Sequence, residues 1–501
     1  MFMRTMGLLL VSALSTQALA AEKEIGHSRT TGRPLESFLV RSQEPQQMSI
    51  YNTGVLSFQK RLEMIASAKK SIEVEFFIYN IDNAGRLFTQ ALVKKAKEGV
   101  KVRVLVDYGW PIAQLDNFYA TLLVQNGVEV RYYNPMISFE LFKGQFRSHR
   151  KALIIDDVQG MTGGRNIADE YFDMATDYNF LDRDIVVRGS MAKSMRQSFD
   201  QFWDSEMTEQ PTIEKEPKID AYNTAYANVR HVSQGQMRFK NALARYSEGM
   251  KKANAYLVQT AQDREILEAT RAASLLSSGS IREHTCTDSI FAADMPGIGN
   301  RSRVLFQEIN RQILSAQKSV HVESPYFVTT IEGMGIINKY LERGVEMNVY
   351  TNSLNSTDAT YTTATLYPRV GFLIENGLNV FIYRGQSIPS QDMAIPEAAK
   401  ARWGLHAKSA VIDDKITMVG TFNVDPRSRN INSEMALMCL NSPGLASDVL
   451  ASMRERRDHS VQLNKDGEPV DGSSRFHGTS IPKRISYYLM LPFANIFSYL
   501  L

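Results

Sequence analysis

Two distant segments of the chain carry the same polar residues at the same spacing. Residues 147–156 read RSHRKALIID, and residues 404–413 read GLHAKSAVID. Counted from His149 and from His406, a lysine follows at offset 2, an aspartate at 7, a glycine at 14 and an asparagine at 17 in both copies. Packing of a single core gives no reason for such a match, so the pattern indicates a duplicated domain.

The duplication extends to the predicted secondary structure around each segment. From residue 57 to 107 the pattern predicts a helix, a strand, an amphipathic helix and a strand, and the same order returns from Val304. Each copy then passes through a helix and an Asn-Gly junction, and the run after each histidine predicts a pair of strands. We therefore expect an α/β fold of two similar sandwich domains, each with a mostly parallel sheet, packed as a pseudo-two-fold pair.

At 501 residues the chain has room for two or three domains with their own cores. The patterns place a signal peptide at residues 1–20 and the two α/β domains at 21–205 and 301–460. Residues 206–300 are polar and favour helix, which predicts a helical connector or cap that either borders the substrate or only packs against a domain. Residues 461–501 make up an apolar C-terminal tail.

The first twenty residues have the layout of a secretory signal peptide. Arg4 precedes an apolar run, and small residues stand before Ala21. We expect cleavage after Ala20 and a mature protein outside the cytoplasm, with an uncleaved membrane anchor as the alternative.

The chain has two cysteines, Cys286 and Cys439. In an exported protein they either form one disulfide or remain two buried thiols. No CxxC spacing occurs, which excludes a cysteine-ligated zinc site.

The repeated residues can form a binding site for a phosphate group. Positions i and i+2 of an extended strand point to the same side, so His149 projects together with Lys151. The glycine-bearing turn that follows can return Asn166 to the same surface. An ammonium group and a carboxamide bind phosphate oxygens and stabilise charge that develops on them. The second copy offers the same set, His406, Lys408 and Asn423.

Two such copies facing each other would place two imidazoles on opposite sides of one phosphorus. One imidazole can then attack in line while the other, protonated, donates to the leaving oxygen. The roles exchange when water or an alcohol attacks the phosphohistidine. This division of labour predicts a phosphodiester transferase or hydrolase, and it explains why the motif occurs twice.

The motif HxKxxxxD followed by GG or GT and an asparagine, present twice, resembles the phospholipase D superfamily over nearly the whole mature chain. The stretches GRNIADEYF and GTFNVDPRSRNINSEMAL are similar to the cardiolipin synthase branch, in particular its shorter, third bacterial form. The resemblance implies a phosphohistidine intermediate formed without a metal or organic cofactor. The expected signal peptide, and not the resemblance, predicts a protein in the periplasm, or on a membrane facing the periplasm.

By analogy with the family, His149 looks like the nucleophile and His406 like the general acid, although the sequence itself is symmetric. Each histidine needs an acceptor that fixes its tautomer, and Glu434 resembles the family's partner for the second histidine. For the first histidine we expect Asp184, with Asp182 as its rival.

The motif aspartates, Asp156 and Asp413, stand at expected strand ends, where aspartate often shapes a turn. We expect them to have a structural or second-sphere role. The copies also differ, because Gly164 stands where the second copy has Thr421, so the first copy is expected to lack one hydroxyl donor to phosphate.

A lipid substrate fits the charge of the chain better than a nucleic acid does. The net charge is only +3, whereas binding of duplex DNA calls for a broad basic face. Residues 485–501 are apolar and aromatic with Pro492 among them, so they either lie in a membrane interface or complete a core. We expect a phospholipid and a membrane surface as partners, with the acceptor and any accessory protein left open. An exported nuclease is the alternative, and a silent binding protein is disfavoured because both copies keep His, Lys and Asn.

Overall fold

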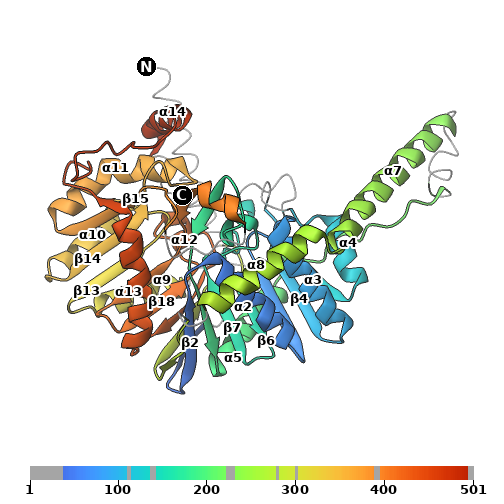
Figure 1. The fold of residues 1–501 in the computed structure, drawn as a ribbon, viewed down its shortest axis with the longest axis horizontal. Helices are drawn as coiled ribbons and strands as arrows, with labels where there is room; N and C mark the ends of the chain where they lie inside the picture. The colour runs from blue at the N-terminus through green and yellow to red at the C-terminus, as the bar shows by residue number, and fades with distance from the viewer. Residues whose placement is uncertain are drawn as a thin grey trace, which may run out of the picture. The chain divides into compact units, whose positions relative to one another are not determined.

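Two sheets organise the chain in this computed structural model, which describes residues 38–109, 114–135, 143–219, 221, 232–277, 281–298, 303–388 and 395–494 (Figure 1). The expected signal peptide and residues 495–501 of the tail lie outside these residues. In spatial order, the first sheet contains β10 (Thr208–Glu209), β5 (Val128–Tyr133), β4 (Lys101–Asp107), β3 (Ser71–Phe76), β6 (Ala152–Ile155), β7 (Gln159–Gly163), β9 (Asp184–Arg188), β2 (Gln46–Tyr51) and β11 (His284–Cys286). The second contains β1 (Phe38–Ser42), β12 (Ser289–Ala293), β19 (Met435–Cys439), β18 (Ile416–Gly420), β17 (Ser409–Ile412), β13 (Ser319–Glu323), β14 (Glu346–Asn352), β15 (Leu378–Tyr383) and β20 (Ser460–Gln462).

The duplication is visible in the strand order. The run β5-β4-β3-β6-β7-β9 of the first sheet corresponds to β15-β14-β13-β17-β18-β19 of the second. The first three strands of each run are parallel, and the strands that follow each histidine pair antiparallel. The expected strand pairs are confirmed, but the expectation of mostly parallel sheets is wrong. Only the βαβ units require parallel pairing, and the hairpins and edge strands add antiparallel partners.

Helices cover the outer faces of the sheets (Figure 1), and β18 of the second sheet contacts β7 and β9 of the first directly. On the first half the helices are α2 (Gly54–Ser67), α3 (Asn83–Lys97) and α4 (Asn117–Gln125), and on the second α9 (Val304–Leu314), α10 (Ile331–Leu341) and α11 (Thr360–Glu375). α5 (Ser190–Trp203) and α13 (Pro443–Asp458) contact strands of both sheets. Buried apolar residues of both halves share one core there, including Ile154 and Val187 of the first and Val411 and Leu437 of the second.

The expected connector is only partly helical. α7 (Val232–Tyr256) packs on α4, and α8 (Ala261–Ser277) packs on α2. The connector then ends in β11, which joins the first sheet, and β12, which joins the second. β1, expected in the first domain, pairs with β12 in the second sheet. Strand pairing therefore crosses the domain boundaries drawn from the sequence, because a short strand can pair with any sheet edge that has free backbone groups.

The two cysteines form a disulfide that joins the sheets. Cys286 ends β11 and Cys439 ends β19, with their Cα atoms 5.9 Å apart. This resolves the alternative between one bridge and two thiols.

The last described helix, α14 (Ile481–Met490), packs on α11 through the buried Tyr487, whose ring lies 6.0 Å from that of Tyr367. None of the helices in the described ranges combines the length and the apolar character needed to span a bilayer.

Candidate active site

Each histidine is fixed by the opposite half of the chain. His149 stands three residues before the first residue of β6, and His406 stands three residues before the first residue of β17. The two histidines are only 7% and 5% exposed. The backbone N–H of His149 donates to the Ser433 carbonyl at 3.0 Å, and that of His406 donates to the Leu181 carbonyl at 2.8 Å. Strand pairing also joins the two halves here. β16 (Arg402–Leu405), which leads to His406, pairs in parallel with β8 (Tyr178–Leu181) of the first half.

Each imidazole is also held by a carboxylate from the opposite half. Nδ1 of His149 lies 3.0 and 2.9 Å from the two oxygens of Glu434, and Nδ1 of His406 lies 2.6 Å from Oδ2 of Asp182. Both carboxylates are fully buried. A carboxylate at Nδ1 fixes the tautomer and orientation of the ring, and it leaves Nε2 as the reactive nitrogen.

This crossed pairing corrects the partners expected from the sequence. Glu434 contacts His149 and not His406, and the rival residue Asp182 contacts His406. Asp184 orients neither histidine, because its Oδ2 accepts hydrogen bonds from Ser57, Arg61 and Arg165 in the core of the first half.

Strand register explains why Asp182 is the counterpart of Glu434. Gly163 of β7 pairs with Asp184, and Gly420 of β18 pairs with Ala436. The residue two positions earlier in the chain is Asp182 in the first half and Glu434 in the second. Alignment of the two copies by these strands, without any structure, would have selected Asp182.

The difference between Gly164 and Thr421 is explained by the carboxylate that each residue adjoins. The Thr421 hydroxyl donates to Oε2 of Glu434 at 2.5 Å, so it holds the carboxylate. A Cβ added at Gly164 would collide with the Asp182 carboxylate. The glycine therefore makes room for Asp182, and the expectation that the first copy lacks a phosphate donor is wrong.

The lysines lie beside their own histidines. Nζ of Lys151 donates to the His149 carbonyl at 2.8 Å, and Nζ of Lys408 donates to the His406 carbonyl at 2.6 Å. Nζ of Lys408 also lies 2.8 and 2.9 Å from the two ring nitrogens of His406. Both lysines are almost completely buried. Two amino groups that carry positive charge when protonated are thus brought together inside the site.

The motif asparagines are buried in the same region. Oδ1 of Asn166 accepts the Ile78 N–H at 3.1 Å. Oδ1 of Asn423 has no hydrogen-bond partner within the described part of the chain. An amide contacts a phosphate group through its Nδ2–H donors, since its oxygen only accepts, so the phosphate contact expected of both asparagines stays a prediction.

Burial and like charges shift the titration of these groups. Burial, followed by the charge of Lys408, lowers the pKa of Lys151 to about 7, and burial lowers the pKa of Lys408 to about 8. Burial and Lys408 also lower the pKa of His406 to about 4. A bound anion would offset the repulsion among these cations, so the site is suited electrostatically to a phosphodiester.

The motif aspartates lie in hairpin turns, Asp156 between β6 and β7 and Asp413 between β17 and β18. Asp156 accepts backbone N–H groups of Lys69, Lys70 and Ser71 at 2.7–2.8 Å. Asp413 makes the equivalent bonds to residues 317–319. Their φ values of 53° and 51° lie in the left-handed region that aspartate tolerates. This geometry agrees with the structural role expected for both residues.

Asp156→Ala and Asp413→Ala should each lower the free energy of unfolding by about 2 kcal/mol, because several backbone donors lose a charged acceptor. The kcat of the folded protein should stay within a few-fold. Burial opposes the shift, but the backbone donors lower the pKa of both carboxyls. Their contribution is therefore complete above about pH 4 and is lost as the pH falls through the lowered pKa. Urea unfolding at pH 7 and pH 3 measures this effect; a large loss of kcat at unchanged stability would contradict it.

Three further residues act on the site without belonging to the repeated motif. Arg427, in the DPRS stretch, lowers the pKa of His149 through its charge. Asp358 raises the pKa of His406 and accepts a hydrogen bond from the Tyr326 hydroxyl at 2.9 Å. The DPRS stretch gave a signal for Arg427. Tyr326, after β13, and Asp358, after β14, gave none, because neither belongs to the repeated residue pattern.

Comparisons with known proteins agree with this geometry. The family model described as "Cardiolipin synthase, PLD-like domain" matches the chain twice, over residues 62–203 and 309–456. Cardiolipin synthase C from Escherichia coli is 26% identical over 434 residues, which cover 83% of this chain and 85% of that protein. An uncharacterized protein from Helicobacter pylori strain J99 is 27% identical over 424 residues, covering 80% and 78%. The solved phosphatidylserine synthase from Haemophilus influenzae shares the fold, with a TM-score of 0.61 at 16% identity over 91% of this chain and 95% of that one.

Proposed function

Because the chain belongs to the phospholipase D-like family of cardiolipin synthase domains, we propose that it transfers phosphatidyl groups between glycerophospholipids through a phosphohistidine. The observation that carries the proposal is the crossed site, with two buried imidazoles that are each oriented by a carboxylate of the opposite half. The name of the Escherichia coli relative supports an alcohol as the acceptor, which would yield cardiolipin when that alcohol is phosphatidylglycerol.

In the first step, Nε2 of one histidine attacks phosphorus and the bond from phosphorus to the headgroup oxygen breaks. The other histidine gives its proton to that oxygen. In the second step, the histidine that gave up its proton takes a proton from the acceptor hydroxyl. The oxygen of that hydroxyl attacks phosphorus, and the bond between phosphorus and the first histidine breaks. Lys151 and Lys408 stabilise the negative charge on the phosphoryl oxygens in both steps.

The charges around the histidines support His149 as the nucleophile. Burial, Lys151, Lys408 and Arg427 all lower the pKa of His149, which keeps its imidazole neutral. Burial and Lys408 lower the pKa of His406 as well, to about 4, but the carboxylates of Asp182 and Asp358 oppose this shift. Burial opposes ionisation of Asp182, but its cationic neighbours hold its pKa well below the usual range. An ionised Asp182 favours a protonated His406 once a phosphate group offsets Lys408, as a general acid requires.

An apolar stripe on α14 supports action at a membrane surface. Ile481, Ile485, Tyr488 and Leu489 share one side of the helix and are 73%, 55%, 57% and 67% exposed. Nζ of Lys483 donates to carbonyls of residues 355 and 357, so α14 lies next to the loop that carries Asp358. An amphipathic helix of this kind lies in a lipid interface with its apolar side inserted.

Ile485→Glu combined with Leu489→Glu should weaken binding to phosphatidylglycerol vesicles about tenfold or more, because two apolar side chains no longer enter the lipid. Cosedimentation with vesicles measures the bound fraction. Val158→Glu in the β6–β7 turn is the matched control, since Val158 is 55% exposed in the first half. Equal binding of all three proteins would refute a membrane contact through α14.

The disulfide supports export from the cytoplasm. A bridge between Cys286 and Cys439 persists in an oxidising compartment and is rare in the cytosol. Together with the expected signal peptide, it leads us to propose a location in the periplasm or on a membrane facing it. The intact mass of the protein recovered from a periplasmic extract tests this, and a mass that includes residues 1–20 would contradict cleavage.

Mass spectrometry of lipid products tests the function directly. The purified protein is incubated with phosphatidylglycerol and phosphatidylethanolamine vesicles, and His149→Ala serves as the control. Cardiolipin formed only by the unaltered protein supports transfer, and phosphatidate identifies water as the acceptor. If no lipid product forms while DNA is cleaved, the protein is a nuclease and the proposal is wrong.

A further inference from the structure

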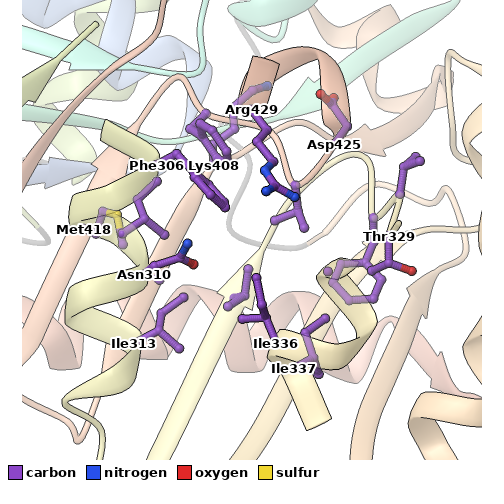
Figure 2. A pocket seen from close by; sticks show the side chains of 18 of the residues that line it. Phe306, Asn310, Ile313, Thr329, Ile336, Ile337, Lys408, Met418, Asp425 and Arg429 are labelled. Atoms are coloured by element: carbon purple, nitrogen blue, oxygen red, sulfur yellow. The ribbon is translucent and has the colours of Figure 1, made fainter. Parts of the chain in front are cut away.

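An apolar pocket of about 150 Å³ lies between α9, α10 and the face of β13, β17 and β18. Figure 2 shows one end with charged side chains and the opposite end with isoleucines. The charged end contains Lys408, Asp425 and Arg429, and the apolar end contains Ile313, Ile336 and Ile337. The pocket therefore leads from a lysine of the active site into a hydrocarbon environment. A pocket of this size with a mainly apolar lining suits a small apolar group better than it suits water.

The duplication supplies an internal comparison, because the first half fills the equivalent space. Gly333 lines the pocket and stands 13 residues before the first residue of β14, as Phe88 does before the first residue of β4. Phe88 is completely buried, and its ring packs on Phe76 with a centroid distance of 6.1 Å. A Cβ at Gly333 would meet only Thr330, at an ordinary 3.4 Å. The space that an aromatic ring occupies in the first half is thus left open in the second.

The neighbouring helices differ in the same way. On α2, Phe58 and Ile65 are 0% and 1% exposed, and α8 packs over this helix. Phe58 and Ile65 stand 13 and 6 residues before the first residue of β3, and Phe306 and Ile313 on α9 stand at the same distances before β13. These two counterparts remain partly exposed and line the pocket. The first half is therefore a closed core, and the second half has the same scaffold with an opening.

We propose that this pocket binds one acyl chain of the phospholipid substrate, an inference that rests on the proposed function. The phosphate group would lie at Lys408, and the chain would pass between α9 and α10 toward Ile313 and Ile337. The Arg429 guanidinium stands over the Phe306 ring at 4.7 Å and pairs with Glu332 at 2.8 Å. Arg429 thereby links α12 (Pro426–Asn430) to both helices that border the pocket and marks its polar end.

The proposal predicts a dependence on chain length. Each methylene that enters the pocket should raise kcat/KM about fourfold, from the transfer free energy of a buried CH₂. The rise should stop when the pocket is full. Monomeric phosphatidylglycerols with chains of increasing length, from about four to eight carbons, measure the slope below the concentration at which they aggregate.

Gly333→Phe is the sharpest variant, because it places in the second half the ring that closes the first. We expect this variant to flatten the dependence on chain length and to weaken binding of cis-parinaric acid, a fluorescent fatty acid, about tenfold or more. Gly335→Phe is the matched control on the same helix, since a Cβ there meets nothing within 4 Å and Gly335 does not line the pocket. Gly333→Leu controls for a disturbance of the helix by the ring. Its smaller side chain should fill less of the pocket and give an intermediate effect.

Retention of the slope and of parinaric acid binding in Gly333→Phe would overturn the proposal, as would loss of both in Gly335→Phe. The binding measurement needs no turnover, so it separates this inference from the proposed function. If the unaltered protein binds parinaric acid through this pocket but converts no phospholipid, the proposed function fails and the apolar pocket stands. If it converts phospholipid at a rate independent of chain length, the function stands and the pocket assignment fails.

Discussion

His406→Asn is expected to accumulate a phosphatidyl group on His149, whereas His149→Asn should form no covalent intermediate. A phosphatidyl ester of p-nitrophenol makes the difference visible, because this leaving group departs without a proton. With His406→Asn, about one equivalent of nitrophenol should be released in a burst, and turnover should then stop because no base activates the acceptor. Absorbance records the burst, and intact mass measures the adduct. With natural lipids, each variant should lose a factor of about 10³ or more in kcat.

The reason for this asymmetry lies in the neighbours of the two rings. Each ring has a carboxylate partner, but burial raises the pKa of Glu434 beside His149 to about 7, whereas the pKa of Asp182 beside His406 is held well below its usual range, against the effect of burial, by its cationic neighbours. Besides burial, Lys151, Lys408 and Arg427 lower the pKa of His149, and the charge of Asp358 acts in the opposite direction on His406. A burst in His149→Asn and none in His406→Asn would reverse the roles. Comparable thermal unfolding of both variants and the unaltered protein is the necessary control, since both histidines are buried.

Much of this site could be predicted from the sequence because its parts recur in local segments. The offsets from His149 and His406 fix a lysine and the motif asparagine in each copy, and the hairpins β6–β7 and β17–β18 follow from the apolar runs after each histidine. Short-range patterns of this kind specify strands and turns through periodicity and turn chemistry. The structural role of Asp156 was accessible for the same reason.

The crossed contacts could not be predicted, because each depends on how the two copies pack. Glu434 lies 285 residues from His149, and His406 lies 224 residues from Asp182. A sequence read one copy at a time suggests that a carboxylate serves the histidine of its own copy. The edge strands β1 and β11, and β12 next to β1, were missed for a related reason, since their pairing is decided by which sheet edge is open.

The crossed pairing leads to the second large effect. Asp182→Asn should lower kcat by a factor of about 10² to 10⁴, because the amide no longer stabilises the imidazolium of His406 or fixes its tautomer. Asp184→Asn is the matched control, two residues away on the same segment. It breaks buried ion pairs with Arg61 and Arg165, so it should reduce stability while kcat of the folded protein stays within a few-fold.

A pH profile separates positioning from a general loss of structure. Asp182 raises the pKa of His406, so its removal should move the alkaline limb of kcat to lower pH, because a general acid acts only while protonated. Asp184→Asn should leave that limb in place. If both variants lost activity equally with unshifted profiles, Asp182 would be merely structural. A shift confined to Asp182→Asn would mean that the first half controls the proton of the second-half histidine, so that neither half could complete the reaction alone.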